Sequence, residues 1–448
     1  MNLEKKYGLP TAIAMVVGIV IGSGVFFKAE KVLSETGGNL VTGILAWIIG
    51  GIIMLICAYF FSIMATKYNF VNGLVDYAEV MVGKKYAYYI GWFMTFAYFP
   101  IIGSTLAWVS ARYLCVILGF DITGGACLAI AGFFLVASFA MNNLAPKIAA
   151  YFQVSTTVIK LIPLFAMGIV GLIVGLSNGQ TMENFTTVVD PNVNQFEALL
   201  TGVVASAFAY EGWIMVTSIN AEIKEPKKNL PKALVIGSII IICTYILYYV
   251  GLSGGASNQV ILEAGEAGVL TAFTNVFGGV LANLLYVFIV VSCLGTLNGI
   301  MLGCTRCLYA LAVRDLGPNP RLFKQVCPVS NVPTNSGFMA ALVSSIWLVY
   351  FYGANLTAPW FGPFSADSSE LVIVLIYILY LPIFVNFIKK EKELSFTKRY
   401  IIPVLSIFAS LFMVFAAYIS HGDKVFYFTF LMIVLLFIGY FYSKPRTN

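Results

Sequence analysis

Two short segments place helix-breaking and polar residues inside long apolar stretches. The first reads GIVIGSGVFF, from Gly18 to Phe27, and the second reads AFAYEGW, from Ala207 to Trp213. Glycine lets a backbone leave the helix and approach a ligand closely. Unwound backbone inside a membrane is tolerated only where it faces protein, water or a ligand. Its N–H groups and the positive helix end suit a carboxylate, and its carbonyls suit an ammonium group, so the two segments together suit a zwitterion.

Other roles remain open for the residues of these segments. Small residues such as Gly22, Ser23 and Gly24 also serve helix packing. Glu211 is able to select a cationic side chain, to accept a proton during transport, or to cap a half-helix. Phe208 and Tyr210 are suited to cover a substrate as an aromatic gate, although aromatic rings in apolar stretches are more often ordinary packing.

A third candidate for chemistry is Lys160, in the sequence TVIKLIPLF. It lies about 12 residues into an apolar stretch, which is about 18 Å along a helix and near mid-membrane. Ionisable residues at such depth usually face a cavity or a partner and mark a coupling or substrate pathway. The ammonium group is able to replace a sodium ion between two helices. The alternative is a structural lysine that binds carbonyls freed by Pro163 or by the first break.

The elements that carry these residues are predicted to be membrane helices. Hydrophobic residues make up 60% of the chain and charged residues 10%, against about 25% charged in soluble domains. About 20 apolar residues cross a bilayer as a helix, and we predict an all-α integral membrane protein with 12 transmembrane helices. They lie near 12–27, 40–66, 86–118, 126–143, 148–176, 196–219, 233–255, 271–312, 336–353, 369–389, 398–418 and 424–442. The breaks interrupt the first and sixth, and Lys160 lies in the fifth.

The distribution of basic residues predicts the orientation. Most of the 26 Lys and Arg residues fall in loops on one side if both termini are cytoplasmic, as the positive-inside rule requires. Lys28 and Lys31 fall on the opposite side, between the first two predicted helices. The net charge of +6 therefore reports topology, and no nucleic-acid partner is expected. We expect a multi-pass protein of the cell (cytoplasmic) membrane without a cleavable signal peptide, forming one domain over 1–448.

The sequence offers little for an enzyme or a metal site. The acidic pairs Asp76 with Glu79 and Glu263 with Glu266 fall in loops on opposite sides. The CxxC pair Cys304 and Cys307 lies inside an apolar helix without histidine partners. The chain's one histidine, His421, is predicted to be an ordinary surface residue. We predict no catalytic residues, no metal and no cofactor. A channel, the third alternative, would show neither substrate saturation nor counterflow.

Several motifs together resemble the amino acid–polyamine–organocation (APC) superfamily. Besides the two broken segments, they are AEIKEPKKNLPKAL from Ala221, LGTLNGIMLGCTRCLYALAVRDLGP from Leu294 and NVPTNS from Asn331. The last two resemble the L-type amino acid exchanger branch, which includes bacterial relatives of the mammalian light subunits. The resemblance implies a LeuT-type fold with alternating access. Inverted repeats would cover about 10–176 and about 196–389, and appended helices about 398–442.

The resemblance also implies roles for individual residues. Backbone groups of Ile21, Gly22, Ser23 and Gly24 would hold the substrate carboxylate. Carbonyls of Phe208, Ala209 and Glu211 would hold its amino group, with Phe208 as the gate. A lysine matching Lys160 replaces sodium in several family members. Ser292 and Thr296, on the eighth helix, would complete that neighbourhood.

These expectations define a function. We predict a sodium-independent exchanger of neutral L-amino acids, whose partners are a small-molecule amino acid and the lipid bilayer, with no accessory subunit required. Relatives commonly carry a small residue or Asp where Glu211 stands. The alternative is therefore a proton-coupled symporter of amino acids, or of cationic amino acids or polyamines.

Overall fold

The computed structural model describes residues 8–68, 73–214 and 223–443, and every regular element among them is a helix. In this described part of the chain, nine helices or uninterrupted helix runs are long and apolar enough to cross a membrane, and a bent pair, Leu9–Val20 with Gly24–Glu35, makes a tenth. The remaining predicted helices are 196–219, which runs beyond the described residues, and 424–442, which appears as a helix of 17 residues. The all-α membrane class is confirmed, and the count of 12 stays a prediction.

One predicted boundary is wrong. The range 271–312 was expected to be one helix, but helix α15 (Glu266–Phe277) ends before Gly278, and α16 (Gly279–Val313) begins after it. Gly278 has a φ of 76°, a conformation that glycine adopts readily and other residues avoid. Hydropathy continues across this glycine, so hydropathy alone could not reveal the end of α15.

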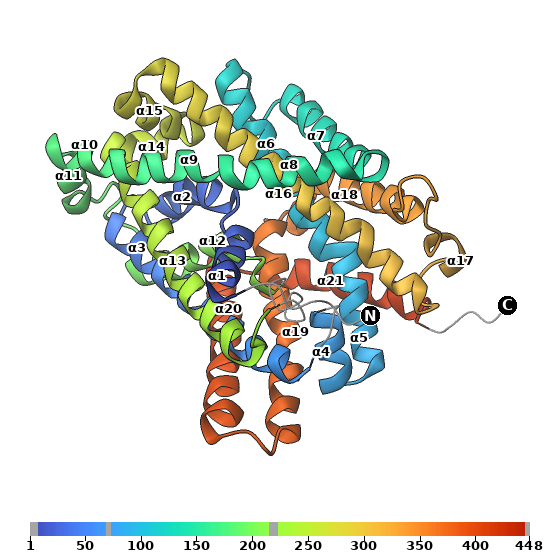
Figure 1. Cartoon of the computed structure of the whole chain (residues 1–448). Helices are drawn as coiled ribbons and strands as arrows, with labels where there is room; N and C mark the ends of the chain where they lie inside the picture. The colour runs from blue at the N-terminus through green and yellow to red at the C-terminus, as the bar shows by residue number, and fades with distance from the viewer. Residues whose placement is uncertain (1–7, 69–72, 215–222, 444–448) are drawn as a thin grey trace. The chain divides into compact units, whose positions relative to one another are not determined.

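The first of two compact units is drawn from residues 1–87, 164–276 and 373–420, and both broken segments lie in it (Figure 1). Its helices are α1 (Leu9–Val20), α2 (Gly24–Glu35), α3 (Leu40–Lys67), α4 (Leu74–Met81), η2 (Ala166–Gly171), α10 (Leu172–Ser177), α11 (Gln180–Thr186), α12 (Gln195–Ala207), η3 (Phe208–Tyr210), α13 (Pro226–Gly255), α14 (Asn258–Ala264), α15, most of α19 (Ser368–Lys390), η6 (Thr397–Ile401) and α20 (Ile402–His421).

Glycines bring helices of this unit close together. A Cβ atom added to Gly251 of α13 would lie 2.3 Å from the carbonyl oxygen of Met167 in η2. One added to Gly254 would lie 2.2 Å from the carbonyl oxygen of Gly171. Contact of this kind, backbone against backbone, is how membrane helices gain dispersion energy without a hydrophobic driving force. It fixes α13 against η2 and α10.

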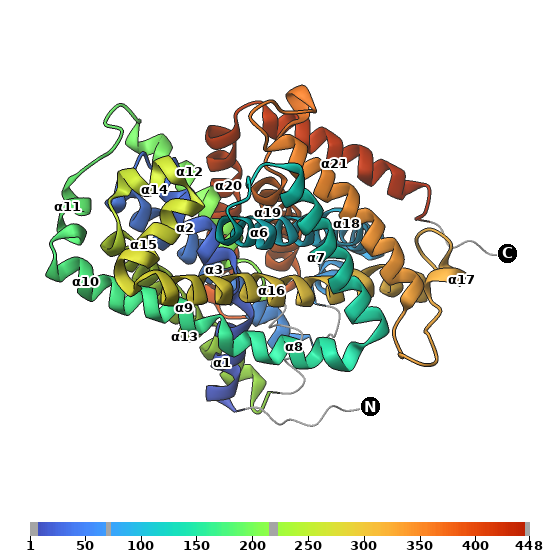
Figure 2. The ribbon, with the colours of Figure 1, turned by 90° about the horizontal axis from the view of Figure 1, so that it is seen from above.

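The second compact unit is drawn from residues 88–163, 277–372 and 421–448. Its helices are most of α5 (Lys84–Phe93), η1 (Met94–Tyr98), α6 (Phe99–Leu118), α7 (Gly125–Leu144), α8 (Pro146–Ile159), α16, α17 (Pro320–Phe323), α18 (Thr334–Ala354), η5 (Gly362–Phe364) and α21 (Lys424–Tyr440), and α9 (Leu161–Phe165) joins the two units in sequence. The long helix α16 runs beside α8 in both views (Figures 1 and 2). Asn298 of α16 binds this neighbourhood together, because its side chain contacts Asn142 at 2.9 Å and Gln153 at 3.1 Å.

Candidate functional site

The first break separates α1 from α2, whose axes differ by 55°. Ile21 leaves the helix with a ψ of 99°, and Ser23 stands at the N-cap of α2. Within the described residues, the N–H groups of Ser23, Gly24 and Val25 have no backbone acceptor. The start of α2 thus presents free N–H groups and the positive end of a helix dipole inside the protein.

The second break ends α12 at Ala207. One turn of 3₁₀ helix follows in η3, where the N–H of Glu211 donates to the carbonyl of Phe208 at 3.3 Å. Glu211 is extended, with a ψ of 160°, and Gly212 has a φ of 103°, where a side chain would be strained. The predicted break is confirmed to the extent that helix α12 stops here. Residues 215–219 of the predicted sixth helix lie outside the described residues.

The two breaks meet in the first unit. A Cβ atom on Gly24 would lie 2.6 Å from the Cα of Ala209, so only glycine permits this approach. The Tyr245 hydroxyl, from α13, lies 3.1 Å from the carbonyl oxygen of Val20 and 2.9 Å from that of Ala209. The rings of Phe27 and Phe208 pack edge to face, with centroids 6.2 Å apart.

Ser23 adds a polar side chain at this junction. It has no solvent exposure, and its Oγ has no hydrogen-bond partner in the described part of the chain. Buried polar groups are nearly always paired. A hydroxyl of this kind, beside free N–H groups, is suited to bind a carboxylate that enters the site.

The structure separates the two candidate gate residues. Tyr210 packs on α3, where its hydroxyl donates to the carbonyl of Trp47 at 2.7 Å and its ring lies 5.7 Å from the Trp47 ring. Phe208 instead faces α2. Tyr210 therefore anchors η3, and Phe208 is the ring placed where the two breaks meet.

Glu211 is the charged residue of the second break. It is half-buried, and one carboxylate oxygen accepts from the N–H of Gly212 at 3.3 Å. Its electrostatic neighbours include Cys57 of α3 and Tyr377 and Tyr380 of α19. This contact with the backbone fits the capping role, and all three roles remain open.

Lys160, Ser292 and Thr296 belong to the second unit. Lys160 is the C-cap of α8, is 6% exposed, and donates its N–H to the carbonyl of Thr156. Gly295 of α16 lies against Thr156, since a Cβ there would be 2.2 Å from Thr156 Oγ1.

The helices α8 and α16 are antiparallel, because Gln153 binds Asn298 while Thr156 meets Gly295. One further turn places Lys160 level with Ser292. The Ser292 hydroxyl is buried and has no hydrogen-bond partner in the described part. The Thr296 hydroxyl donates to the Ser292 carbonyl at 3.1 Å. The neighbourhood expected for Lys160 and Ser292 is therefore compatible with the helix register.

Two residues at the junction, Tyr245 and Lys28, were not predicted from the sequence. Tyr245 left no sequence signal, because its contacts depend on how α13 packs. Lys28 was assigned to the outer side, but it lies in α2 without solvent exposure. Its Nζ is 4.8 Å from the Phe27 ring centroid and 5.6 Å from that of Phe208. Its spacing of four residues from Gly24 was the signal that could have found it.

The expectation for His421 is wrong. Its Nε2 lies 3.0 Å from Oε2 of Glu370, a carboxylate that is 2% exposed. His421 ends α20 and Glu370 lies in the first turn of α19. A buried carboxylate needs a hydrogen-bonding partner, which explains why this histidine is not an ordinary surface side chain.

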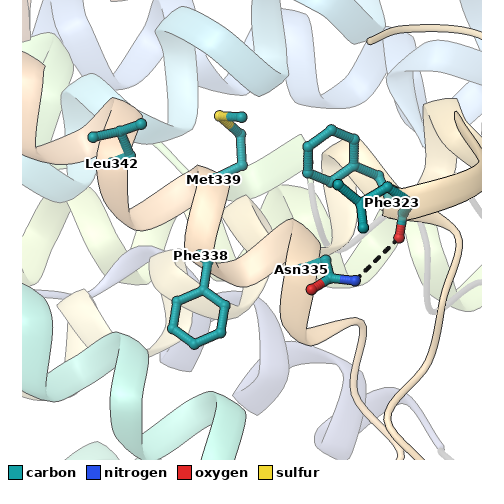
Figure 3. A pocket seen from close by; sticks show the side chains of 6 residues that line it. Phe323, Asn335, Phe338, Met339 and Leu342 are labelled. Carbon is teal, nitrogen blue, oxygen red and sulfur yellow. Dashed lines mark hydrogen bonds between the residues drawn. The ribbon is translucent and has the colours of Figure 1, made fainter. Parts of the chain in front are cut away.

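An open groove lies elsewhere, on α17 and α18. Its lining is Leu322, Phe323, Asn335, Phe338, Met339 and Leu342. Figure 3 shows the Asn335 amide donating to the carbonyl of Leu322, at 3.3 Å. The lining is otherwise apolar, and Phe338 is 65% exposed. The groove lacks the paired donors and acceptors that a zwitterion requires.

A family model described as amino acid permease matches residues 7–440. This chain belongs to the amino acid permease family. Serine/threonine exchanger SteT of Bacillus subtilis is 28% identical over 90% of the chain and 87% of its own length. Human b(0,+)-type amino acid transporter 1 is 26% identical over 98% and 88%. The human cystine/glutamate transporter is 22% identical over 92% and 80%.

The solved structures agree on the fold. The inward-facing structure of Mhp1 covers 99% of this chain and 96% of its own, with a TM-score of 0.60 and 14% sequence identity. The predicted LeuT-type fold and the predicted APC relationship are confirmed. The protein is a membrane transporter and not an enzyme, since its family and its relatives are transporters.

Proposed function

We propose that this permease exchanges neutral L-amino acids by alternating access at the junction of its two broken helices. The observation that supports this most is the contact between Gly24 and Ala209, which brings an N–H-rich helix start to the carbonyl end of α12 and η3. The carboxylate of an amino acid would bind at Ile21 to Gly24, and its amino group at Phe208, Ala209 and Glu211. Phe208 would close over the bound substrate.

Sodium independence is part of the proposal. Lys160 supports it, because a buried ammonium group near Ser292 and Thr296 would supply the positive charge that sodium otherwise provides. Lys160→Ala should lower the transport rate or the substrate affinity while the protein still reaches the membrane. Wild-type kinetics in this variant would remove Lys160 from the coupling mechanism.

Reconstituted proteoliposomes test exchange. Vesicles loaded with unlabelled serine, in sodium-free buffer, should take up labelled serine several-fold faster than empty vesicles. A second arm replaces choline with sodium on the outside and should change nothing. Equal uptake into loaded and empty vesicles would refute exchange, and a requirement for sodium would refute the role given to Lys160.

The second candidate is a proton-coupled symporter of amino acids, or of cationic amino acids or polyamines. Glu211 favours it, because a half-buried carboxylate in the second break is able to take up a proton. A pH gradient, acidic outside, should then drive uptake into empty vesicles, and Glu211→Gln should abolish this dependence. Uptake that does not depend on the pH gradient would favour exchange over proton-coupled symport.

Further proposals concern the setting of the protein. We propose a location in the cell membrane with both termini in the cytoplasm, as the distribution of Lys and Arg predicts. The substrate is a small amino acid, the surroundings are a lipid bilayer, and we propose that the chain works without an accessory subunit. Exchange by purified protein alone would support the last point.

A further inference from the structure

The groove on α17 and α18 changes from polar to apolar along its length. Asn335, in the first turn of α18, lies at the polar end, and Leu342 follows two turns later, about 10 Å along the helix axis. Phe338 and Met339 lie between them in Figure 3. Because α18 is long and apolar enough to cross a membrane, the groove begins at a membrane surface and continues into the hydrocarbon region.

The walls of the groove are held in place by contacts with the rest of the second unit. Phe323 is buried against Leu308 of α16, and Met339 packs on the same cluster. The Asn335 amide donates to the carbonyl of Leu322 at 3.3 Å, which ties α18 to α17. Fixed walls reduce the entropy that is lost when a ligand binds. The groove is therefore preformed.

The apolar end of the groove opens on a face of α18 that meets lipid. Phe338, Leu342 and Ile346 are 65%, 57% and 61% exposed. They follow one another at intervals of four residues, so they lie on one face of the helix. At this depth the surroundings are the acyl chains of the bilayer. An acyl chain therefore suits the apolar lining.

Positive charge is available at the polar end. Between Gly317 and Leu342 the sequence contains two basic residues, Arg321 and Lys324, and no acidic residue. Lys324 Nζ lies 3.1 Å from Oδ1 of Asp315, so that pair is neutral. Arg321 is exposed on α17, and in the described part of the chain no ion pair involves it. A ligand with an anionic group and an acyl chain complements both ends of the groove.

The opposite end of α18 provides a contrast. The charged residues that follow it, before and within the first turn of α19, are Asp367 and Glu370. From Gln325 to Ile388 the sequence contains no lysine or arginine. One end of α18 is thus basic and the other is acidic, and an anionic headgroup is attracted to the basic end, where the groove lies.

We propose that the groove binds an anionic phospholipid, with an acyl chain along Phe338, Met339 and Leu342 and the phosphate at Arg321. In the proposed topology this lipid belongs to the cytoplasmic leaflet, where basic pockets between membrane helices bind anionic headgroups. One basic residue near the membrane surface strengthens the attraction about fivefold. The site is separate from the paired breaks, so the inference does not depend on the proposed amino acid substrate.

Photolabelling in proteoliposomes tests the proposal. Phosphatidylcholine vesicles contain, in separate samples, a trace of phosphatidylglycerol or of phosphatidylcholine that carries the same photoreactive acyl chain. Mass spectrometry compares the labelling of residues 335–342 with that of α7 around Phe133. Phe133 is 68% exposed, like Phe338, but does not line the groove. It therefore reports ordinary contact with bilayer lipid.

The phosphatidylglycerol probe should label 335–342 at least fivefold more than the phosphatidylcholine probe, and the two probes should label α7 equally. Arg321→Gln should reduce this preference about fivefold, whereas Arg321→Lys, which keeps the charge, should retain it. Lys424→Gln, at the exposed start of α21, is the matched control and should keep the wild-type ratio. Equal labelling by the two probes in the wild type, or an unchanged ratio in Arg321→Gln, would overturn the proposal.

Competition distinguishes a lipid from other occupants of the groove. Excess unlabelled phosphatidylglycerol should displace the probe from 335–342, and excess glycerol phosphate should not. Displacement by glycerol phosphate would assign the site to a free phosphate compound and overturn the proposal. Labelling of α7 without any labelling of 335–342 would show that protein covers the groove, with the same consequence. If Arg321→Gln yields no folded protein, the wild-type ratio decides, since it needs no substitution.

Discussion

Gly24 and Ala209 bring the two broken segments into direct contact. A methyl group at Gly24 would meet the Ala209 Cα at 2.6 Å, closer than a methyl group and a backbone carbon ever pack. One of the two broken segments would have to move. The contact between the two segments therefore requires that residue 24 has no side chain.

Gly24→Ala should reduce transport by at least tenfold, because overpacking costs about 1–3 kcal/mol and here displaces the backbone that binds the substrate. Initial rates in proteoliposomes, normalised to protein in the membrane, measure the effect. Gly132→Ala, in α7, is the control, since a Cβ there meets nothing within 4 Å. Equal losses in both variants would return Gly24 to a general packing role.

The Tyr245 hydroxyl holds both breaks, through the carbonyls of Val20 and Ala209. Tyr245→Phe should weaken substrate affinity several-fold and lower the free energy of unfolding by about 0.5–1.5 kcal/mol. Substrate half-saturation and thermal unfolding measure the two effects. Tyr151→Phe, at an exposed position of α8, should change neither, and unaltered affinity in Tyr245→Phe would deny the hydroxyl a role at the site.

The sequence predicted these residues unevenly. Gly22 to Gly24 and Phe208 to Glu211 could be proposed because glycine and charge inside an apolar stretch are recognisable from the sequence alone. Tyr245 and the anchoring of Tyr210 on Trp47 depend on which helices pack together, and no local pattern encodes that. Lys28 was missed because a cation near a predicted helix end resembles a loop residue until its helix is extended.

Among the helices, α3 and α19 are joined at their C-terminal ends. Glu391, immediately after α19, is 2% exposed and accepts from Lys67 and from the Tyr68 hydroxyl at the end of α3. Lys390 Nζ also donates to the carbonyl of Val80 in α4, at 2.8 Å. These contacts hold α19 to α3 and α4 within the first unit.

Glu391→Gln should lower the thermal unfolding midpoint by several degrees, because a buried hydrogen bond to a charged group contributes about 1.5–3 kcal/mol. Thermal unfolding in detergent measures this change. Glu393→Gln, two residues later and exposed, should leave the midpoint within about one degree, as surface substitutions usually do. Identical midpoints for the two variants would show that the junction of α3 and α19 adds no stability.

Element boundaries illustrate what hydropathy encodes. The helix Leu40–Lys67 differs from the expected range 40–66 by one residue. Polar residues mark both of its ends: the Asn39 side chain accepts from the N–H of Thr42 at the start, and Lys67 is the last residue. The end of α15 was missed because Gly278 interrupts an apolar run without adding polarity. The backbone conformation of Gly278 ends α15, and amino-acid composition does not predict that conformation.

In the whole molecule, each compact unit takes corresponding helices from both predicted repeats. The first two predicted helices of each repeat fall in the first unit, and the third and fourth of each in the second. This regular division supports our proposal that 1–448 is one transporter domain with repeats at about 10–176 and 196–389 and appended helices at about 398–442.

Cys327 offers a test of the proposed orientation. It lies in the connection between α17 and α18, on the predicted cytoplasmic side. Hydrogen bonds from the backbone and hydroxyl of Ser330 and from the backbone of Val329 lower the pKa of the Cys327 thiol to about 7. The reactive thiolate should therefore form as the pH rises through about 7, below the ordinary range of about 8.5.

A membrane-impermeant maleimide should label Cys327 in inside-out vesicles, with a rate that is half-maximal near pH 7, and should not label it in sealed right-side-out vesicles. Cys327→Ser identifies any labelling of other cysteines. Labelling of Cys327 from the outside would reverse the proposed topology of the chain.

We propose that an amino acid binds where the two broken helices meet. The most direct measurement is a structure of the protein with the amino acid that stabilises it most in a thermal screen. We expect the carboxylate within hydrogen-bonding distance of the N–H groups of Ser23 and Gly24, and the amino group at the carbonyls of Phe208 and Ala209. An amino acid bound elsewhere, with Gly24 and Ala209 still in contact and no ligand beside them, would contradict it.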